Sequence, residues 1–390
     1  MTEKLYYKDA YIKEFTATVL DCTENGGKYL VTLDRTAFFP EEGGQYADRG
    51  TIDGIAVLDV QERDGGIYHY TEKPIALGKE VYCELDFARR FENMQLHTAE
   101  HILCGIIHRL YGYDNVGFHL GEDVVTFDIS APLSREQLDF VEDEANRAVF
   151  ANIAVETLFP TPDELTSMTY RAKLDITEGV RLVRIGEVDS CACCAPHVAR
   201  TGEIGLIKCL DFASHKGGVR ITMLAGARAL ADYRRAYERE KRIGALTSTP
   251  REQTDLAVEK LLADMQSLRY KISETALSVA QTVAEGITPT EGNAVVLFPI
   301  DDNEAQRRLA NLMTERVGGI CTVLSGNEGA YRFVMTSRSV RLNTVIKEIT
   351  ASLGGKGGGK AEMVQGTFSA NIDEIKGFLE NYSLPKSSTN

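Results

Sequence analysis

The chain has 390 residues, 43% of them hydrophobic, which suits two or three domain cores better than a single ordinary one. Its formal net charge of −14 argues against indiscriminate nucleic-acid binding, because that mode depends on many basic contacts with phosphate. No apolar stretch is long enough to span a membrane, and the acidic N-terminal residues do not form a secretory signal. We therefore expect a cytoplasmic protein without a membrane partner.

The first 90 residues have the pattern of short β-strands. Apolar and polar residues alternate in brief runs, and the Gly and Asp residues between the runs are typical of turns. The runs cover residues 17–20, 28–33, 54–60 and 66–70. We expect a small β-barrel, or a sandwich of the same strands.

A long loop at 34–50 interrupts these strands. Its Gly43-Gly44 pair prevents regular structure, while Thr36 and Gln45 offer uncharged donors and Asp48 a carboxylate. On composition alone, a turn with solvated polar residues is the simpler interpretation.

The run at 90–108 has apolar residues at helical spacing and contains His97 and His101. Residues four apart lie on the same face of a helix, so the two imidazoles can bind one cation. An ordinary helix with hydrogen-bonded histidines is the alternative.

A cysteine-rich stretch lies downstream at 191–197. It repeats the four-residue separation with Cys193 and His197, although Cys191 and Cys194 leave open which sulfur is used. The eight cysteines of the chain are otherwise scattered singly, which favours reduced thiols over a disulfide framework. A thiolate and three imidazoles suit tetrahedral Zn²⁺, so we expect both stretches to meet around one zinc ion.

The region from 113 to 224 contains both the two-residue alternation of strands and the periodicity of helices. Residues 113–129 alternate like strands, 134–150 have a helical period with Ser134 as N-cap, and 201–209 and 216–226 again predict strands. The predicted fold class is α+β.

Helical signals dominate from 225 onward. Residues 220–242 contain seven Arg or Lys against three acids, a local excess of positive charge that suits a phosphate backbone. The next helix has an apolar seam at Val258, Leu261, Met265, Leu268, Ile272 and Val279, and we expect it to pack against the preceding helix or another subunit, with core packing favoured.

The last hundred residues read as an α/β module. Strands are predicted at 293–298, 320–324 and 331–336, with helices at 302–316 and 342–353. A glycine-rich run at 354–360, with Lys356 and Lys360, is expected to bring backbone N–H groups up to a phosphate, with a solvated turn as the alternative.

Four stretches together resemble the editing half of alanyl-tRNA synthetases. They are Thr36–Gln45, His97-Thr-Ala-Glu-His101, Cys193-Cys-Ala-Pro-His197 with the following Thr201-Gly-Glu-Ile-Gly, and Gly354-Gly-Lys-Gly-Gly-Gly-Lys. The chain thus resembles the long form of the AlaX family, the free-standing alanyl-tRNA editing hydrolases. The synthetases typically read Cys-Gly-Gly-Thr-His, so the Cys-Ala-Pro middle of this chain is expected to reshape the pocket beside the metal.

The resemblance implies four domains and no aminoacylation activity. They are an N-terminal β-barrel (1–90), a zinc-bearing editing domain (91–228), a helical arm (229–286) and a C-terminal DHH-associated α/β domain (287–390). It also implies hydrolysis of the ester that joins serine or glycine to tRNA(Ala). A homodimer would form through the arm or the C-terminal domain.

The resemblance also assigns candidate residues. His97, His101, Cys193 and His197 would hold one zinc ion, and Glu100, Gln45 and Thr36 are the catalytic candidates. Substrate contacts would come from Thr36, Gly43, Gly44 and Gln45. The candidates for tRNA contacts are Lys216, Arg220, Arg234, Arg235, Lys356 and Lys360.

Two other functions fit parts of the sequence. His97-Thr-Ala-Glu-His101 also spells the inverted zinc-peptidase motif H-x-x-E-H, in which the glutamate is the general base. A peptidase of that kind takes a carboxylate as its remaining ligand, which the downstream Cys193 does not provide. The other alternative is a tRNA-binding protein whose zinc is only structural.

Replacing Lys356 and Lys360 together by alanine should weaken tRNA binding and flatten its dependence on salt, because fewer counterions would be released. Filter binding at several salt concentrations measures both effects. An unchanged salt slope would exclude these lysines from the tRNA contact.

Overall fold

The computed structural model describes residues 2–172 and 179–383. It divides into two compact units, Met1–Glu240 and Lys241–Asn390, and the boundary falls within helix α4 (Gly226–Thr247). Helices and strands are mixed in both units, so the predicted α+β class is confirmed. The four-domain division stays a prediction. None of the helices in the described ranges combines the length and apolarity that crossing a bilayer requires.

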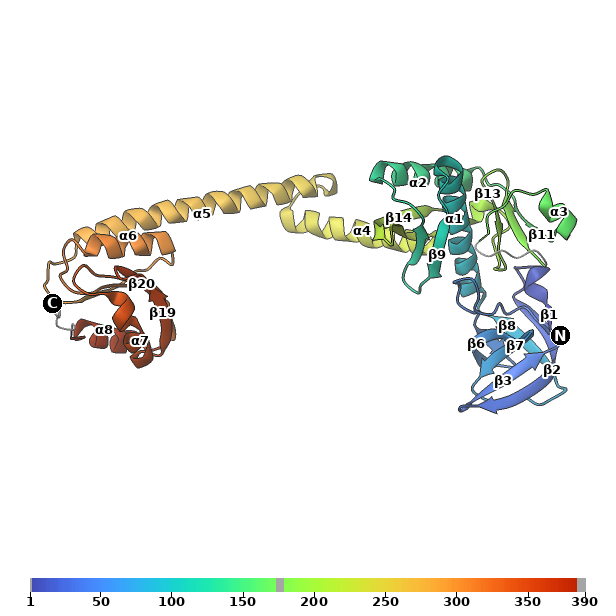
Figure 1. Ribbon diagram of the computed structural model, residues 1–390, viewed down its shortest axis with the longest axis horizontal. Helices are drawn as coiled ribbons and strands as arrows, with labels where there is room; N and C mark the ends of the chain where they lie inside the picture. The colour runs from blue at the N-terminus through green and yellow to red at the C-terminus, as the bar shows by residue number, and fades with distance from the viewer. Residues whose placement is uncertain (1, 173–178, 384–390) are drawn as a thin grey trace. The chain divides into compact units, whose positions relative to one another are not determined.

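Six antiparallel strands of the first unit close into a barrel in the order β2-β3-β7-β6-β5-β8 (Figure 1, blue). Alternate residues of each strand point inward, as a strand with one buried face requires; Val31, Leu33, Val81 and Cys83 are at most 1% exposed. The strands are β2 (Glu14–Asn25), β3 (Lys28–Leu33), β5 (Gly50–Ile52), β6 (Ile55–Arg63), β7 (Gly66–Thr71) and β8 (Glu80–Leu85). Before and between them lie β1 (Glu3–Lys4), η1 (Leu5–Tyr7) and β4 (Arg35–Thr36).

Helix α1 (Phe87–Tyr111) follows the last barrel strand directly. The side chain of Asp86 accepts a hydrogen bond from the backbone N–H of Arg89 at its start, and Gly112 ends it in a left-handed conformation. The predicted helix is therefore confirmed and extends three residues further at each end. Buried residues occupy most of its length, which places both predicted histidine ligands inside the unit.

A four-stranded antiparallel sheet in the order β14-β15-β10-β9 shares one core with α1 and α2. Phe127 and Ile221 of the sheet pack with Ile102 of α1 and Leu138 of α2. The predicted N-cap Ser134 is confirmed and forms a reciprocal capping box with Gln137. These elements are β9 (Asn115–Leu120), β10 (Val125–Ile129), α2 (Arg135–Phe150), β14 (Ile207–His215) and β15 (Gly218–Ala225).

A small three-stranded sheet, β11-β12-β13, carries the cysteine-rich stretch beside α1 (Figure 1). Cys191 belongs to its last strand, and Cys193 follows immediately after that strand ends. The elements are β11 (Val155–Leu158), α3 (Pro162–Thr166), β12 (Leu182–Ile185), β13 (Asp189–Ala192) and η2 (Thr201–Ile204).

A buried ion pair joins α1 to the loop that interrupts the barrel. Arg90 is fully buried, and its guanidinium bonds both carboxylate oxygens of Asp48 as well as the carbonyls of Ala10 and Ala37. Asp48 in turn accepts a hydrogen bond of 2.6 Å from the backbone N–H of Phe39. The loop is therefore fixed relative to the helix that carries His97.

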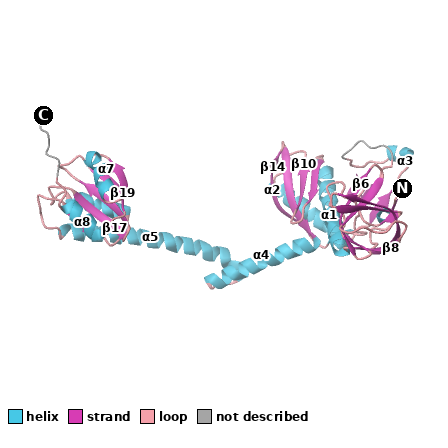
Figure 2. Cartoon of the chain, turned by 90° about the horizontal axis from the view of Figure 1, so that it is seen from below, coloured by secondary structure: helices cyan, strands magenta, loops and turns pink. Residues whose placement is uncertain are grey.

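The second unit is a five-stranded sheet with helices on both faces, as the cartoon in Figure 2 shows. Val323 and Val334 pack with α6 and the end of α5, whereas Leu324 and Phe333 pack with α7 and α8. The predicted strands and helices of this region are confirmed. The sheet order is β16-β17-β18-β20-β19. The elements are η3 (Arg251–Gln253), α5 (Thr254–Glu285), β16 (Ala294–Leu297), α6 (Asn303–Met313), β17 (Cys321–Asn327), β18 (Ala330–Thr336), α7 (Leu342–Ser352), β19 (Gly355–Gly359), β20 (Met363–Phe368) and α8 (Ile372–Glu380).

Two expectations for this unit were wrong. The glycine-rich run is not a loop but the edge strand β19, and its glycines allow close pairing, since a Cβ on Gly355 would lie 2.0 Å from the carbonyl oxygen of Thr367. In the described residues, most of the apolar seam of α5 is not packed into a core; its last member, Val279, packs against the core around α6. The seam residues Val258, Leu261, Met265, Leu268 and Ile272 are 42–57% exposed.

Replacing Asp48 by alanine would leave the buried charge of Arg90 without an anionic partner, and should lower the unfolding free energy of the first unit by about 3–5 kcal/mol. Urea unfolding followed by circular dichroism measures this loss. Asp128→Ala is the control, because its partner Arg220 is largely exposed, and its loss should be much smaller. Equal losses in the two variants would contradict the structural role given to the buried pair.

Candidate metal centre

The four side chains predicted as ligands come together. His97, His101, Cys193 and His197 each place one donor atom within 4.8 Å of the others. Cys193 Sγ lies 3.6 Å from His97 Nε2 and 3.4 Å from His197 Nε2, and each histidine is at most 5% exposed. Two segments almost a hundred residues apart thus form one buried group of three nitrogens and one sulfur.

The spacing of these donors fits a metal ion. In a tetrahedral site with nitrogen and sulfur ligands, metal–ligand distances of about 2.0–2.3 Å place neighbouring donors roughly 3.3–3.8 Å apart. The two separations from Cys193 Sγ fall within this range. The residues present can therefore hold such an ion without a large rearrangement.

Hydrogen bonds to the far ring nitrogens orient the two histidines of α1. His97 Nδ1 lies 2.8 Å from Gln45 Oε1, and His101 Nδ1 lies 3.0 Å from Asp189 Oδ2. An amide oxygen and a carboxylate oxygen can only accept, so each Nδ1 must carry the proton. The tautomer that results leaves Nε2 of both rings free to bind a metal.

The third histidine is oriented in the same way by a helix hydroxyl. Thr98 Oγ1 donates its proton to the carbonyl of Met94 at 2.7 Å, so it can only accept from His197 Nδ1, 3.0 Å away. His197 Nε2 then faces Cys193 Sγ. All three imidazoles therefore present the same nitrogen to the centre.

Sequence reasoning missed Asp189, the acceptor for His101. Asp189 is 6% exposed and also binds Arg171, with Nε to Oδ1 at 2.7 Å. Its position two residues before Cys191 on the same strand was the one available signal. The sequence spacing did not indicate Thr98. Its hydroxyl orients His197, which is 99 residues away in the sequence.

The electrostatics favour metal-binding forms at two of the four ligands. Burial opposes the thiolate of Cys193, but His97, His197 and His101 outweigh it and hold the pKa of Cys193 well below its usual value. Burial lowers the pKa of His197 to about 3, which keeps that ring neutral. For His101, burial is outweighed by Asp189 and the neighbouring sulfurs, so its pKa is raised. A metal ion would displace that proton on binding.

The neighbouring cysteines lie outside the four-residue group. Cys191 forms a second group of possible ligands with His101 and Asp189, but the ion pair with Arg171 already engages that carboxylate. Burial raises the pKa of Cys194, which disfavours its thiolate. Of the three cysteines at 191–194, Cys193 is thus the best candidate for the sulfur ligand.

The Gly43-Gly44 pair forms a tight turn that places Gln45 behind His97. Both glycines have positive φ, +62° and +84°, and the flanking Glu42 and Gln45 exchange backbone hydrogen bonds. A Cβ on Gly44 would lie 2.4 Å from the carbonyl oxygen of Phe118. Gln45 is fully buried, with Oε1 on His97 and Nε2 without a partner among the described residues.

Thr36 lies inside the barrel region and is fully buried. Its Oγ1 lies 2.8 Å from His69 Nε2, and it accepts a hydrogen bond from the backbone N–H of Phe38. Thr36 does not line the cavity beside the cluster. Its contact with substrate stays a prediction.

A cavity of about 400 Å³ opens beside the cluster. His97, His101 and Cys193 form part of its wall, together with Gly43 and Glu100. The lining also includes Tyr7, Glu42, Asn115, Arg171 and Arg181. Three of the four candidate ligands are thus accessible to a small substrate group.

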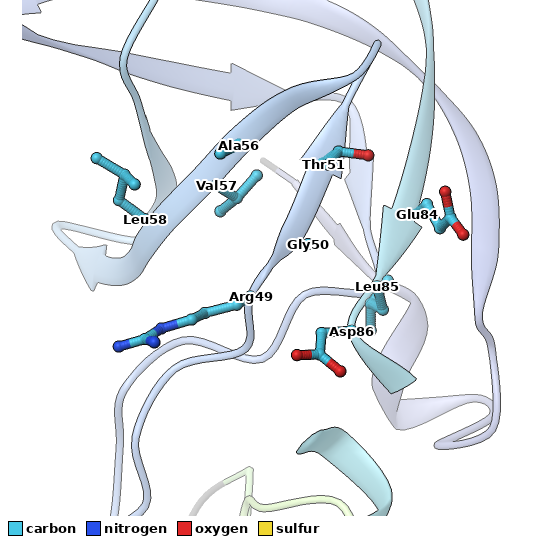
Figure 3. Close-up of a pocket in the computed structure, with 9 residues that line it drawn as sticks. All are labelled: Arg49, Gly50, Thr51, Ala56, Val57, Leu58, Glu84, Leu85 and Asp86. Carbon is cyan, nitrogen blue, oxygen red and sulfur yellow. The ribbon is translucent and has the colours of Figure 1, made fainter. Parts of the chain in front are cut away.

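A separate hollow on the barrel, shown in Figure 3, is less suited to this chemistry. It lies between strands β5, β6 and β8, and its lining includes Arg49, Glu84 and Asp86 but no histidine or cysteine. It therefore offers no nitrogen or sulfur ligands.

Some of the residues predicted to contact tRNA form ion pairs within the protein, and others are simply exposed. Arg220 is paired with Asp128 at 2.7 Å, and Arg235 with Asp232 at 3.0 Å. Lys216 is exposed in the turn between β14 and β15. Arg234, Lys356 and Lys360 are exposed as well. Their contacts with RNA remain predictions.

Comparisons with known proteins match both halves of the chain. Residues 180–222 match the Threonyl and Alanyl tRNA synthetase second additional domain, and residues 274–383 match the DHHA1 domain. The alanyl-tRNA editing protein AlaX-L of Pyrococcus horikoshii is 29% identical over 96% of both chains. Aarsd1 of Rattus norvegicus, also named an alanyl-tRNA editing protein, is 29% identical over 97% of both.

A longer relative matches over part of its length. The alanine–tRNA ligase of Halobacterium salinarum is 34% identical over 94% of this chain but only 42% of the ligase. The resemblance predicted from the sequence is confirmed, because this chain is similar along nearly its whole length to alanyl-tRNA editing proteins.

Replacing Gln45 by leucine removes the acceptor for His97 Nδ1, and should weaken metal binding about 10–100-fold, the usual cost of losing such a partner. Thr98→Val should do the same through His197. Competition with a chromophoric chelator measures both affinities. If Gln45→Leu instead keeps full metal affinity and changes only the KM for substrate, Gln45 is a substrate contact as the sequence suggested.

Proposed function

We propose that this chain, an AlaX-type relative of the alanyl-tRNA editing proteins, is an aminoacyl-tRNA hydrolase that acts on mischarged tRNA(Ala). The ester between serine or glycine and the 3′-terminal adenosine is the bond cleaved. The supporting observation is the group of three histidines and Cys193, of which His97, His101 and Cys193 line a cavity large enough for an aminoacyl group. The similarity to editing proteins over 96% of the chain supports the substrate class.

We propose one zinc ion per chain, held by His97, His101, Cys193 and His197. A thiolate with neutral imidazoles is a typical zinc ligand set. When bound, zinc would supply Lewis-acid polarisation at the reacting ester. The cytoplasm, where thiols stay reduced, suits such a site.

The residues of the chain orient the substrate. An aminoacyl ester is already activated, so positioning contributes much of the rate. Gly43 brings bare backbone to the cavity wall, while Glu100 and Asn115 offer polar groups there. A site that hydrogen-bonds the serine hydroxyl would reject alanine strongly, but glycine cannot be selected by that contact.

The inverted zinc-peptidase alternative has less support. In that mechanism Glu100 would act at the metal and a carboxylate would complete the ligands. Here the other two ligands are Cys193 and His197, and one oxygen of Glu100 is engaged by Asn115. The tRNA-binding alternative would be favoured if zinc-loaded protein failed to deacylate Ser-tRNA(Ala) above the spontaneous rate.

The partners we propose are tRNA(Ala) and a second copy of the chain. The candidates for tRNA contacts are Lys356 of β19 and the following Lys360, Lys216 and Arg220 of the β14–β15 hairpin, and Arg234 and Arg235 of α4. The exposed apolar seam of α5 is suited to pairing with the same helix of a second copy.

Replacing Cys193 by alanine should remove the bound metal and abolish hydrolysis of Ser-tRNA(Ala), because a metal ligand is lost. Cys194→Ala is the matched control and should keep its metal. Metal content after gel filtration and release of radiolabelled serine are the measurements. A Cys193→Ala variant that kept zinc and cleaved peptides would instead favour the peptidase.

A further inference from the structure

We infer that Glu100 binds the α-ammonium group of the aminoacyl ester, so that the site hydrolyses esters of free amino acids and rejects N-acylated ones. This inference rests on the proposed function and names a recognition element of the same site. It assigns Glu100 a substrate contact in place of the proton transfer expected from its motif.

The two oxygens of Glu100 have different surroundings. Oε1 accepts from Asn115 Nδ2 and from Cys104 Sγ, the latter at 3.3 Å. The backbone N–H of Gly117 donates to Asn115 Oδ1 at 3.0 Å, so the amide cannot be reversed and Nδ2 must face the glutamate. Hydrogen bonds from Asn115 and Cys104 therefore fix the position of Glu100 Oε1.

The other oxygen remains available. Glu100 is 3% exposed and lines the cavity next to His97 and His101. Its Oε2 accepts no hydrogen bond within residues 2–172 and 179–383. The side chain is therefore placed to meet a ligand that enters the cavity.

In the described part of the protein, no lysine or arginine forms an ion pair with this carboxylate. Arg171, on the same cavity wall, is paired with Asp189, and Arg181 donates to the carbonyls of Cys193 and Ala195. Glu100 also stands outside the four-residue ligand group. Since the hydrogen-bond donors to this buried carboxylate are neutral, a ligand with a cationic group would be favoured there.

The proposed substrate carries such a group in the right place. The α-ammonium of an aminoacyl ester is attached to the carbon next to the ester carbonyl, so it enters the cavity with the reacting bond. A charge-assisted bond to Oε2 would hold that carbonyl near the ligand cluster. Serine and glycine share this group, which lets glycine bind without a side-chain contact.

N-acylation removes the charge and provides the test. Wild-type protein should hydrolyse Ser-tRNA(Ala) on the order of 100-fold faster in kcat/KM than N-acetyl-Ser-tRNA(Ala), because the acetylated ester leaves Glu100 unpaired. Glu100→Gln has the same shape and keeps an oxygen for Asn115. It should raise KM for the seryl ester and leave the acetylated ester unaffected, so that the preference disappears.

Two further variants complete the design. Glu100→Asp keeps the charge and should regain part of the preference. Glu42→Gln removes a charge from another cavity-lining glutamate and should keep the preference in full. Metal content is measured for each variant, so that comparisons use equally loaded protein.

Three results would overturn the inference. The first is a Glu100→Gln variant that lowers kcat on both esters equally and keeps the preference for the free ester. That result would mean either that Glu100 transfers a proton or that the site rejects the acetyl group because of its size. If Glu42→Gln lost the preference, Glu42 and not Glu100 would be the carboxylate that binds the ammonium group. Equal rates of the wild type on both esters would exclude ammonium recognition. Absence of hydrolysis of either ester would instead contradict the proposed function, and this inference with it.

Discussion

The orientation of three imidazole rings is the constraint on which the rest of the site depends. Each ring has its Nδ1 hydrogen-bonded to a different kind of acceptor: an amide, a carboxylate and a hydroxyl. Since each acceptor fixes both the tautomer and the direction of the ring, the three Nε2 atoms converge near Cys193 Sγ. Hydrogen bonds with the surrounding protein therefore orient the ligand group.

Those surroundings come from separate parts of the first unit. Gln45 reaches His97 from the barrel loop, which a Gly-Gly turn shapes and the buried pair of Arg90 and Asp48 fixes to α1. Asp189 reaches His101 from a different sheet. The barrel and the small sheet thus serve the site by supplying acceptors at fixed positions, although neither contributes a ligand of its own from within a strand.

The sequence identified the four clustered candidate ligands better than it identified the groups that orient them. The candidate ligands occur in pairs four residues apart, His97 with His101 and Cys193 with His197, and this spacing can be read directly from the sequence. Acceptors such as Thr98 and Asn115 depend on contacts between distant segments, which no local pattern records. For the same reason Gln45 was expected to face substrate, whereas its amide oxygen lies on His97.

Elsewhere the limits of local patterns have other causes. The glycines at 354–359 were expected to form a loop, because glycine is compatible with turns and phosphate contacts. In the structure they pair with β20, and a Cβ on Gly355 or Gly359 would collide with the backbone of that strand. The seam of α5 has the spacing of a core helix, but spacing alone does not reveal whether a partner helix belongs to the same chain.

X-ray absorption at the zinc edge of the metal-loaded protein tests the central claim most directly. The account predicts one sulfur at about 2.3 Å and three nitrogens at about 2.0–2.1 Å, with the imidazole scattering that three histidines produce. A spectrum with two or more sulfurs, or without imidazole scattering, would contradict the centre described here.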